Sequence, residues 1–411
     1  MTPKILLITT SRWFATTRLA MAFAQLGCDV EAMCPSGHLL TKTRVVRRLH
    51  SYSGLLPMKS IRDATDAAQP DLVVPCDDLA TKHLHHWHAI EKQSGGDSLR
   101  IVALLERSLG NPEHFSSIDS RNEFMSLALQ ERVRAPKTAV VTSPDDLKRW
   151  IVENGLPAVL KVDGSFGGAG TEIVYSVEEA ESAFRKLNVG ILMTRAAKRA
   201  VVGRDTTFVR SWLQNRRAVV NVQSFVAGPD ASTSAACWQG EVLAMIQFEV
   251  LNKTNPKGSA SVLRLIRNPA ISTAVKKMVS RLGLSGLVGF DFIIEERSGD
   301  AHLIELNARA TQTCHLQLGE GCDLAAALHS KISGESIRYA PRVTANQVIA
   351  LFPQEWIKNP DSPFLKTAYH DVPWEEPELV RAGTQFRPQN GGWLSQGKWR
   401  EVRSKLSVRR A

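Results

Sequence analysis

Short apolar runs alternate with helix-like patterns over the first hundred residues of the chain. KILLITT (4–10), DVEAMCP (29–35) and DLVVPCDD (71–78) are each short, apolar and bounded by polar or turn residues, so they predict buried strands. RLAMAFAQLG (18–27) and IRDATDAAQP (61–70) lie between them with the spacing of amphipathic helices. Strands that alternate with helices predict a parallel sheet covered on both faces.

The first connection from strand to helix, TTSRWFATT (9–17), contains no glycine. A dinucleotide site needs glycines at this turn, because they let the pyrophosphate approach the helix N-terminus. The sequence therefore disfavours a nicotinamide or flavin site. The change in periodicity predicts that this first α/β domain ends near residue 115.

A different pattern follows at PAVLKVDGSFGGAGTEIVYS (157–176), which predicts a strand, a glycine-rich turn and a second strand. A P-loop would run from a strand into a helix and end in Gly-Lys-Ser/Thr, which this segment lacks. Backbone N–H groups of a glycine loop can still cradle phosphates, and Lys161 before the loop would supply a positive charge. A plain glycine turn between strands is the common alternative.

The segment GFDFIIEERSGDAHLIEL (289–306) predicts two strands joined by a short polar turn. Glu305, Asn307 and Arg309 are spaced by two, so they project from one face of the second strand, and the hairpin brings Asp291 beside them. Two carboxylates and an amide oxygen suit Mg²⁺ that keeps water and phosphate oxygens in its other positions. A surface hairpin is the alternative, but the surrounding isoleucines and leucines indicate a buried sheet, where unpaired carboxylates are costly.

Composition limits the function only loosely. The 411 residues, 43% of them apolar, are typical of a globular protein of roughly two to four domains. The net charge of +10 favours anionic partners, which include nucleic acid, a membrane surface or an anionic small molecule. Solvated surface charge is the simpler interpretation of the basic segments TKTRVVRRLH (41–50) and KWREVRSKLSVRR (398–410).

The six cysteines show no Cys-x-x-Cys spacing, and no apolar run is long enough to cross a bilayer. We therefore expect a cytoplasmic protein with reduced thiols and no membrane contact. KHLHHWH (82–88) contains four histidines, but no cysteine or carboxylate accompanies His83, His86 and His88 at ligand spacing. We expect these histidines to lie on a solvated helix and not in a zinc site.

Together these features resemble the ATP-grasp superfamily. The shared features are the VLK strand with its glycine loop, the segment QSFVAGPD (223–230) and the pattern that ends in IELNARATQTCHL (304–316). The resemblance implies a multidomain α/β and α+β fold. Its parts would be an N-terminal Rossmann-like pre-ATP-grasp domain (1–115), a two-subdomain ATP-grasp fold (116–335) with a lid at about 138–222, and a small C-terminal domain (336–411).

The resemblance also implies how the chain would hold ATP. Lys161 would bind the phosphates, under a mobile loop that contains Gly167, Gly168 and Gly170. The family's upstream lysine has no match here, because SIDSRNEF (117–124) offers Arg121 in its place. The segment 223–230 would be the hinge that holds adenine and ribose, through the side chain of Gln223, the backbone around Phe225 and Val226, and the carboxylate of Asp230.

In the same way, Asp291, Glu305 and Asn307 would bind Mg²⁺, with Mn²⁺ as an alternative, and Arg309 would steady the reacting acyl group. The activity implied is that of a ligase that converts a carboxylate to an acylphosphate, which an amine or similar nucleophile displaces. Arg264 in SVLRLIR (261–267) is a further candidate for contacting the phosphate or the acylphosphate, and a surface ion pair explains it equally well.

The partners would then be a small-molecule carboxylate and an amine, and a homodimer is the default assembly. Two other functions stay open. A carbamoyl-phosphate-synthase-like or biotin-carboxylase-like enzyme would phosphorylate bicarbonate. A non-catalytic protein of the same shape, binding nucleic acid through its positive charge, would have no reason to keep the row of acid, amide and arginine, so nucleic acid is not expected as a partner.

Overall fold

The computed structural model describes residues 2–94, 99–163, 170–188, 219–256, 258–337 and 339–385. Its N-terminal part contains a four-stranded sheet in the order β3-β2-β1-β4, and every pair of neighbours is parallel. The parallel sheet predicted from the alternating pattern is therefore present. Its strands are β1 (Lys4–Ile8), β2 (Asp29–Cys34), β3 (Arg48–Ser51) and β4 (Leu72–Pro75).

Helices cover both faces of this sheet. The side chains of β1 alternate between the faces and pack against the helices on each side. Ile5 and Leu7 pack in one core with residues of α1 (Phe14–Gln25), whereas Leu6 and Ile8 pack on the other face. The helices on that other face are α2 (Pro57–Ala68), α3 (Asp78–Ser94) and α4 (Leu99–Leu109). Short helical turns η1 (Leu39–Lys42) and η3 (Pro112–His114) and helix α5 (Phe115–Asp119) complete this region.

The histidines of α3 do not form a solvated face. His83, His85 and His88 are all buried, and only His86 is exposed. The ring of His85 stacks on Phe115 of α5 at 4.0 Å between ring centroids. The expectation of a solvated helix is thus wrong for most of this segment, because Phe115 of α5 packs on His85 and His88, and Tyr52 lies beside His83. No group of three or more His, Cys, Asp or Glu side chains suited to a metal occurs in the described parts of the chain.

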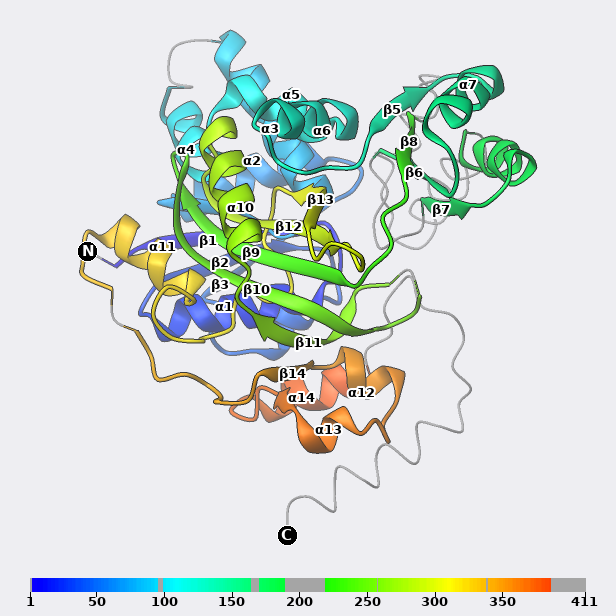
Figure 1. Ribbon diagram of the computed structural model, residues 1–411. Coiled ribbons are helices and arrows are strands. Elements are labelled where there is room, and N and C mark those ends of the chain that lie inside the picture. The colour runs from blue at the N-terminus through cyan, green and yellow to red at the C-terminus, as the bar shows by residue number, and fades with distance from the viewer. Residues whose placement is uncertain are drawn as a thin grey trace.

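The central sheet has seven strands in the order β13-β12-β9-β10-β11-β14-β15 and lies at the middle of the molecule (Figure 1). One face packs on the N-terminal part, in the core shared with α1. The other face packs on α6 (Arg121–Gln130) and α10 (Pro269–Leu282). The strands are β9 (Asp230–Trp238), β10 (Glu241–Lys253), β11 (Ala260–Ile266), β12 (Gly286–Ile294), β13 (Ala301–Asn307), β14 (Val348–Leu351) and β15 (Tyr369–Asp371).

A third sheet projects to one side of the central one in Figure 1, and we call it the lid sheet after the lid predicted from the sequence. It is antiparallel, in the order β5-β8-β6-β7, and it packs on helix α7 (Pro144–Asn154). Its strands are β5 (Thr138–Val141), β6 (Ala158–Val162), β7 (Thr171–Val174) and β8 (Val220–Ser224).

The segment after residue 335 adds strands to the central sheet. Strand β14 pairs antiparallel with β11, and β15 pairs with β14. Phe352 also packs edge-on against Phe14 of α1, with ring centroids 5.4 Å apart. The domain boundaries stay predictions, but the C-terminal part shares both a sheet and a core with the rest of the chain. Its helices are α12 (Gln354–Lys358), α13 (Phe364–Thr367) and α14 (Pro377–Thr384), and α11 (Leu324–Ser333) precedes it.

None of the helices in the described ranges combines the length and the apolar character needed to cross a membrane.

Candidate active site

The predicted acidic hairpin is formed by β12 and β13. Asp291 lies directly opposite Glu305, and Gly289 lies opposite Asn307, so the two carboxylates and the amide share one face of the sheet. The Asn307 side chain donates a hydrogen bond from Nδ2 to Oδ2 of Asp291, at 3.0 Å. The alternation read from the sequence therefore brings these three side chains together.

The two carboxylates of the hairpin have different proton affinities. Burial, followed by repulsion from Glu305, raises the pKa of Asp291 to about 6. Burial acts in the same direction on Glu305, but the positive charges of Arg121 and Lys161 outweigh it, and the pKa of Glu305 is lowered. A site that makes one buried carboxylate difficult to ionise gains from a cation, because the cation would relieve the repulsion between the two acids.

Arg121 begins helix α6 and supplies the counter-ion of Glu305. Its Nη2 donates to Oε1 of Glu305 at 2.7 Å, and its Nη1 donates to the backbone oxygen of Ile304 at 3.3 Å. Its Nε lies 3.9 Å from Asp163, which also accepts a hydrogen bond of 2.9 Å from Asn221. The sequence indicated Arg121 only as a replacement for a missing lysine, and gave no sign that Asp163 would lie beside it.

Lys161 stands on β6 of the lid sheet with only 8% of its surface exposed. Burial and, next, repulsion from Arg121 lower its pKa to about 8, while the charges of Glu305, Asp291 and Asp230 act in the opposite direction. A lid lysine and the acids of the hairpin thus act on one another electrostatically. The lysine and the acids belong to different sheets, so the site lies between the lid and the central sheet.

The loop after Lys161 is described only at its edges. Gly170 lies at the start of the returning strand, and its backbone oxygen accepts a hydrogen bond of 3.0 Å from the N–H of Val162. Gly167 and Gly168 lie outside the described residues. The proposed closure of this loop over phosphates therefore stays a prediction.

The predicted adenine hinge connects β8 of the lid to β9 of the central sheet. Gln223 is buried, and its Nε2 donates to Oγ1 of Thr138 at 3.0 Å, so its side-chain amide already has a partner inside the lid. Asp230 forms an ion pair with Lys253. Phe225 and Val226 are partly exposed. Phe225 and Val226 thus lie in the connection, Gln223 lies in β8 before it, and Asp230 begins β9 after it.

Gly228 explains how this connection passes so close to the hairpin. A Cβ atom at position 228 would lie 1.9 Å from the backbone oxygen of Ile294. The backbone N–H of Ile294 also donates to Pro229, and that of Glu296 donates to Ala227. Only glycine permits this approach, which fixes the hinge beside the strand that carries Asp291.

Arg309 does not project freely from the strand. Its Nε donates to Oδ1 of Asp78 at 2.9 Å, and its Nη2 donates to Oδ1 of Asn307 at 3.1 Å. Burial would lower the pKa of Arg309, but the adjacent Asp78 outweighs it and the pKa is raised. Asp78 follows β4 in the N-terminal part, so this part of the chain reaches the site as well. The sequence showed two acids at the end of the segment 71–78 but not what they contact.

The structure does not bring Arg264 to this site. Arg264 lies opposite Glu249 on β10, which lies opposite Ala231 on β9 and so in line with Phe292. Directly paired residues share a face of the sheet, so Arg264 projects from the face opposite to that of Asp291. Arg264 Nη1 lies 3.2 Å from the Glu249 carboxylate, and half of the arginine side chain is exposed. The surface ion pair is the interpretation that fits.

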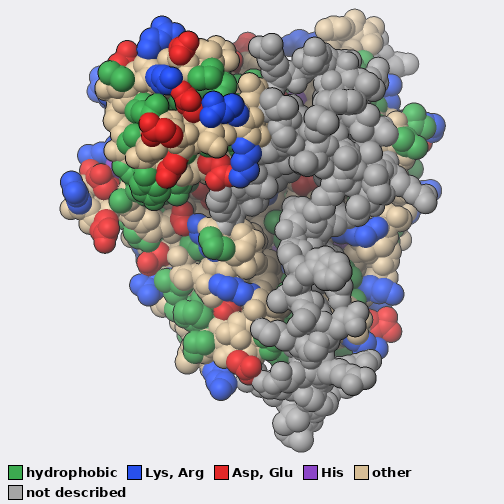
Figure 2. Space-filling model, turned by 90° about the vertical axis from the view of Figure 1, so that its right-hand side faces the viewer, with side chains coloured by type: hydrophobic (Ala, Val, Ile, Leu, Met, Phe, Trp, Pro, Cys, Tyr) green, Lys and Arg blue, Asp and Glu red, His purple; other side chains and the backbone are tan. Residues whose placement is uncertain are grey.

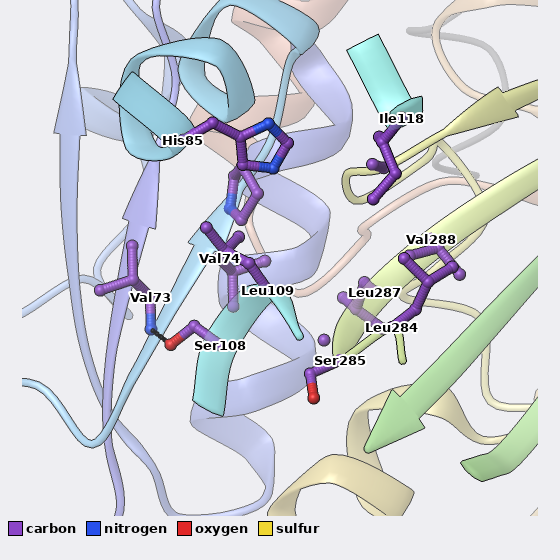
Figure 3. Close-up of a pocket in the computed structure, with 13 residues that line it drawn as sticks. Val73, Val74, His85, Ser108, Leu109, Ile118, Leu284, Ser285, Leu287 and Val288 are labelled. Carbon is purple, nitrogen blue, oxygen red and sulfur yellow. Dashed lines mark hydrogen bonds between the residues drawn. The ribbon is translucent and has the colours of Figure 1, made fainter. Parts of the chain in front are cut away.

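A small cavity lies elsewhere, between β4, α3, α4 and the beginning of β12 (Figure 3). The side chains that face it are mostly apolar, among them Val74, Leu109 and Val288. Its volume of about 10 Å³ is roughly what one water molecule requires. This cavity is a packing gap where two parts of the chain meet, and it is too small for a substrate.

The residues present fit a magnesium ion that arrives with a nucleotide. The hairpin offers two carboxylates and one amide oxygen, which is fewer than a metal site made only of protein ligands requires. Mg²⁺ commonly takes one or two carboxylates together with water and substrate phosphates. Lys161 and Arg121 add two positive charges that act on these acids.

Part of the chain matches a known protein family, and the fold matches solved structures. Residues 194–313 match the ATP-grasp domain family. The biotin carboxylase domain of 2-oxoglutarate carboxylase from Hydrogenobacter thermophilus, solved as a dimer with MgADP and bicarbonate, superposes with a TM-score of 0.60 at 16% identity, over 83% of this chain and 71% of that one. An L-amino acid ligase from Bacillus licheniformis gives 0.56 at 16% identity, over 82% and 78%.

The chain matches smaller shares of two curated relatives than of these solved structures. The large chain of carbamoyl phosphate synthase from Pseudomonas syringae is 23% identical over 54% of this chain and 20% of its own. Phosphoribosylamine–glycine ligase from Xanthomonas axonopodis is 25% identical over 55% and 52%. The chain thus spans about half of the latter relative and a fifth of the former. The family match and the superpositions together show that this chain contains an ATP-grasp domain and has the fold of the ATP-grasp ligases.

Proposed function

We propose that this chain is an ATP-dependent, Mg²⁺-requiring ligase. It would activate a small-molecule carboxylate as an acylphosphate and couple it to an amine or similar nucleophile, with release of ADP and phosphate. One observation carries the proposal: the lid lysine Lys161 lies within electrostatic reach of Arg121, of the hairpin acids Asp291 and Glu305, and of Asp230 at the end of the hinge. The side chains that would bind phosphates and the oxygens that would bind a metal are therefore close enough to serve one site.

In this proposal each group acts mainly by position and charge, as expected for phosphoryl transfer. Lys161 and Arg121 would hold the phosphates of ATP, and the hairpin oxygens would hold the metal, which offsets charge on the transferred phosphoryl group. Mn²⁺ would serve in the same set of oxygen ligands. Arg309, which lies next to this row and is anchored by Asp78, would face the acyl group.

The carboxylate–amine reaction is favoured by the names of two similar proteins, the L-amino acid ligase and the glycine ligase. A reaction that begins with phosphorylation of bicarbonate is the second candidate, because the carboxylase domain was solved with bicarbonate and the carbamoyl phosphate synthase chain is also a relative. The two candidates differ only in the acid that attacks ATP, so one assay distinguishes them.

A non-catalytic nucleic-acid-binding role has less support. Figure 2 shows a face on which basic and acidic side chains are interspersed over the described residues. Nucleic-acid binding would be favoured by a continuous positive surface. The partly buried carboxylate of Asp291, held beside the second acid Glu305, would also be costly to keep ionised without a metal to bind.

The proposal includes a homodimer, since the similar carboxylase domain was solved as a dimer. It also includes a cytoplasmic location, because all six cysteines are free thiols and five of them are buried, as suits a reducing compartment.

The test is Mg-ATP-dependent release of ADP against a panel of carboxylic acids, with hydroxylamine present to trap an acylphosphate as its hydroxamate. We expect one class of acid to give both ADP and hydroxamate. ADP formed with bicarbonate alone would establish the second candidate. The matched control is Glu305→Gln, which removes one charge from the hairpin at nearly constant shape.

Glu305→Gln should abolish turnover while the thermal unfolding curve remains cooperative. Normal turnover with an unchanged dependence on Mg²⁺ in this variant would overturn the metal assignment. Binding of ATP without any release of ADP across the panel and with bicarbonate would overturn the ligase proposal.

A further inference from the structure

Asp78 is the point at which the N-terminal part of the chain reaches the proposed metal site. It is the first residue of α3, just beyond the end of β4, and its Oδ1 accepts a hydrogen bond of 2.9 Å from Nε of Arg309. Both side chains are largely buried, with 29% of Asp78 and 17% of Arg309 exposed. Screening by water is therefore limited, and the ion pair is stronger than one on an open surface.

Arg309 connects Asp78 to the proposed metal ligands through further hydrogen bonds. Its Nη2 donates to Oδ1 of Asn307 at 3.1 Å, and Nδ2 of Asn307 donates to Oδ2 of Asp291 at 3.0 Å. Arginine on one side and a carboxylate on the other permit only one orientation of the Asn307 amide. An amide oxygen has two lone pairs, so Oδ1 keeps one for a metal while it accepts from Arg309.

The turn that carries Asp78 is itself held firmly. Asp77 accepts hydrogen bonds from the backbone N–H groups of Thr10 and Ser11 and from the hydroxyl groups of Thr9 and Thr10. Backbone contacts join the same turn to the end of β13, since Ala310 N–H donates to Pro75 at 2.9 Å. Asp78 therefore presents its carboxylate from a fixed position.

We infer that Asp78 is a positioning residue for metal binding: through Arg309 it fixes the amide of Asn307 and, with it, the carboxylate of Asp291. This inference rests on the proposed function of the hairpin as a Mg²⁺ site. Partners that orient metal ligands in this way commonly contribute a factor of roughly 10–100 to metal affinity or activity. The hydrogen bonds assign that role to a residue 231 positions away from Arg309 in the chain.

The test measures how strongly Mg²⁺ enhances the binding of ADP, by calorimetry with and without the metal. In Asp78→Asn the enhancement should fall by about tenfold or more, while ADP binding without Mg²⁺ stays as in the unsubstituted protein. Asp145→Asn is the matched control, since Asp145 is an exposed acid in the first turn of helix α7 in the lid. Its Mg²⁺ enhancement should be unchanged.

A double-mutant cycle with Arg309→Gln shows whether Asp78 acts through the arginine. If it does, the double variant loses no more Mg²⁺ enhancement than Arg309→Gln alone. The inference would be overturned if the losses of the two single variants multiply in the double variant. It would also be overturned if Asp78→Asn keeps the full enhancement. An unsubstituted protein in which Mg²⁺ does not affect ADP binding would instead contradict the proposed function itself.

If Asp78→Asn does not fold, Arg309→Lys tests the same contacts. Lysine keeps the charge beside Asp78, but it lacks the planar fork that reaches Asp78 and Asn307 together. The Mg²⁺ enhancement should again fall by about tenfold. A full enhancement in a folded Arg309→Lys protein would show that Asn307 needs no such support.

Discussion

Arg121 and Glu305 are each other's counter-ions, with 2.7 Å between Nη2 of the arginine and Oε1 of the glutamate. They lie 184 residues apart in the chain and belong to helix α6 and strand β13. In the proposed reaction Arg121 would contact phosphate and Glu305 would help to hold the metal. Each of the two charges would then exchange its present partner for a new one of opposite charge.

Arg121→Ala should weaken the binding of Mg-ADP by roughly 10- to 100-fold, because a hydrogen bond to a charged group contributes about 1.5–3 kcal/mol. Arg121→Lys keeps the charge and should recover most of the affinity. Calorimetric titration measures both variants, and Arg62→Ala serves as the control, since Arg62 pairs with Glu91 in the N-terminal part, outside the proposed site. Equal affinity in all four proteins would exclude Arg121 from the nucleotide site.

The pKa of Lys161 near 8 predicts a decline of kcat/KM for ATP above about pH 8. The amine loses its proton there, and a neutral amine attracts phosphate far less. In Lys161→Arg the guanidinium keeps its charge, so the decline should move to higher pH even if the maximal rate is lower. The measurement is the pH profile of both proteins between pH 6 and about 10. If kcat/KM declines at the same alkaline pH in both proteins, Lys161 is not the titrating group.

Asp291→Asn should make the protein more stable and inactive at once. The pKa of Asp291 in the folded protein is about 6, above its ordinary value, so ionisation at higher pH destabilises the fold. The asparagine variant should therefore melt a few degrees higher at pH 8. This difference should shrink as the pH falls below about 6, because the native carboxyl group then becomes neutral.

Thermal unfolding at several pH values without Mg²⁺ and nucleotide tests this prediction. A variant that melts lower than the unsubstituted protein at pH 8 would show that Asp291 is already stabilised by its neighbours, which include Asn307.

A buried group of charges holds the C-terminal segment in place. Asp371 on β15 accepts hydrogen bonds from Arg18 of α1 and from His315, each at 2.7 Å. Asp371→Asn leaves the arginine without its main partner and should destabilise the fold by about 3–5 kcal/mol. Glu375→Gln is the control, because Glu375 is half-exposed and lies 3.8 Å from the same arginine.

Burial would raise the pKa of Asp371, but Arg18 and His315 outweigh it and lower the pKa to about 2. The stability that this carboxylate supplies is therefore present above its ordinary pKa and is lost as the pH falls towards 2. Urea unfolding at neutral pH and at about pH 3 compares the unsubstituted protein with Asp371→Asn. A difference that does not diminish at low pH would contradict this origin.

Local patterns in the sequence predicted much of the hairpin and of the N-terminal sheet. Strand alternation alone places Asp291, Glu305 and Asn307 on one face, since it depends only on neighbouring residues. The partners of Arg121 and Arg309 could not be predicted, because they come from distant parts of the chain.

A local sequence pattern also does not show which side chains other parts of the chain will bury. His83 and His88 looked like solvated residues of an amphipathic helix, yet both are buried in the folded chain. The sequence left Arg264 open as either a contact of the acylphosphate or a surface ion pair, and only the strand register shows that it projects from the face opposite to Asp291.

The loop after β1 has a consequence for selectivity. Open α/β sheets commonly receive ligands at the carboxyl ends of the strands where the strand order reverses, which here is the boundary between β1 and β4. The carboxylate of Asp77 already occupies the N–H and hydroxyl donors of Thr10 and Ser11 at that boundary. An incoming phosphate would have to compete with this tethered carboxylate for the same donors, so we expect the carboxyl end of β1 to bind phosphorylated molecules poorly.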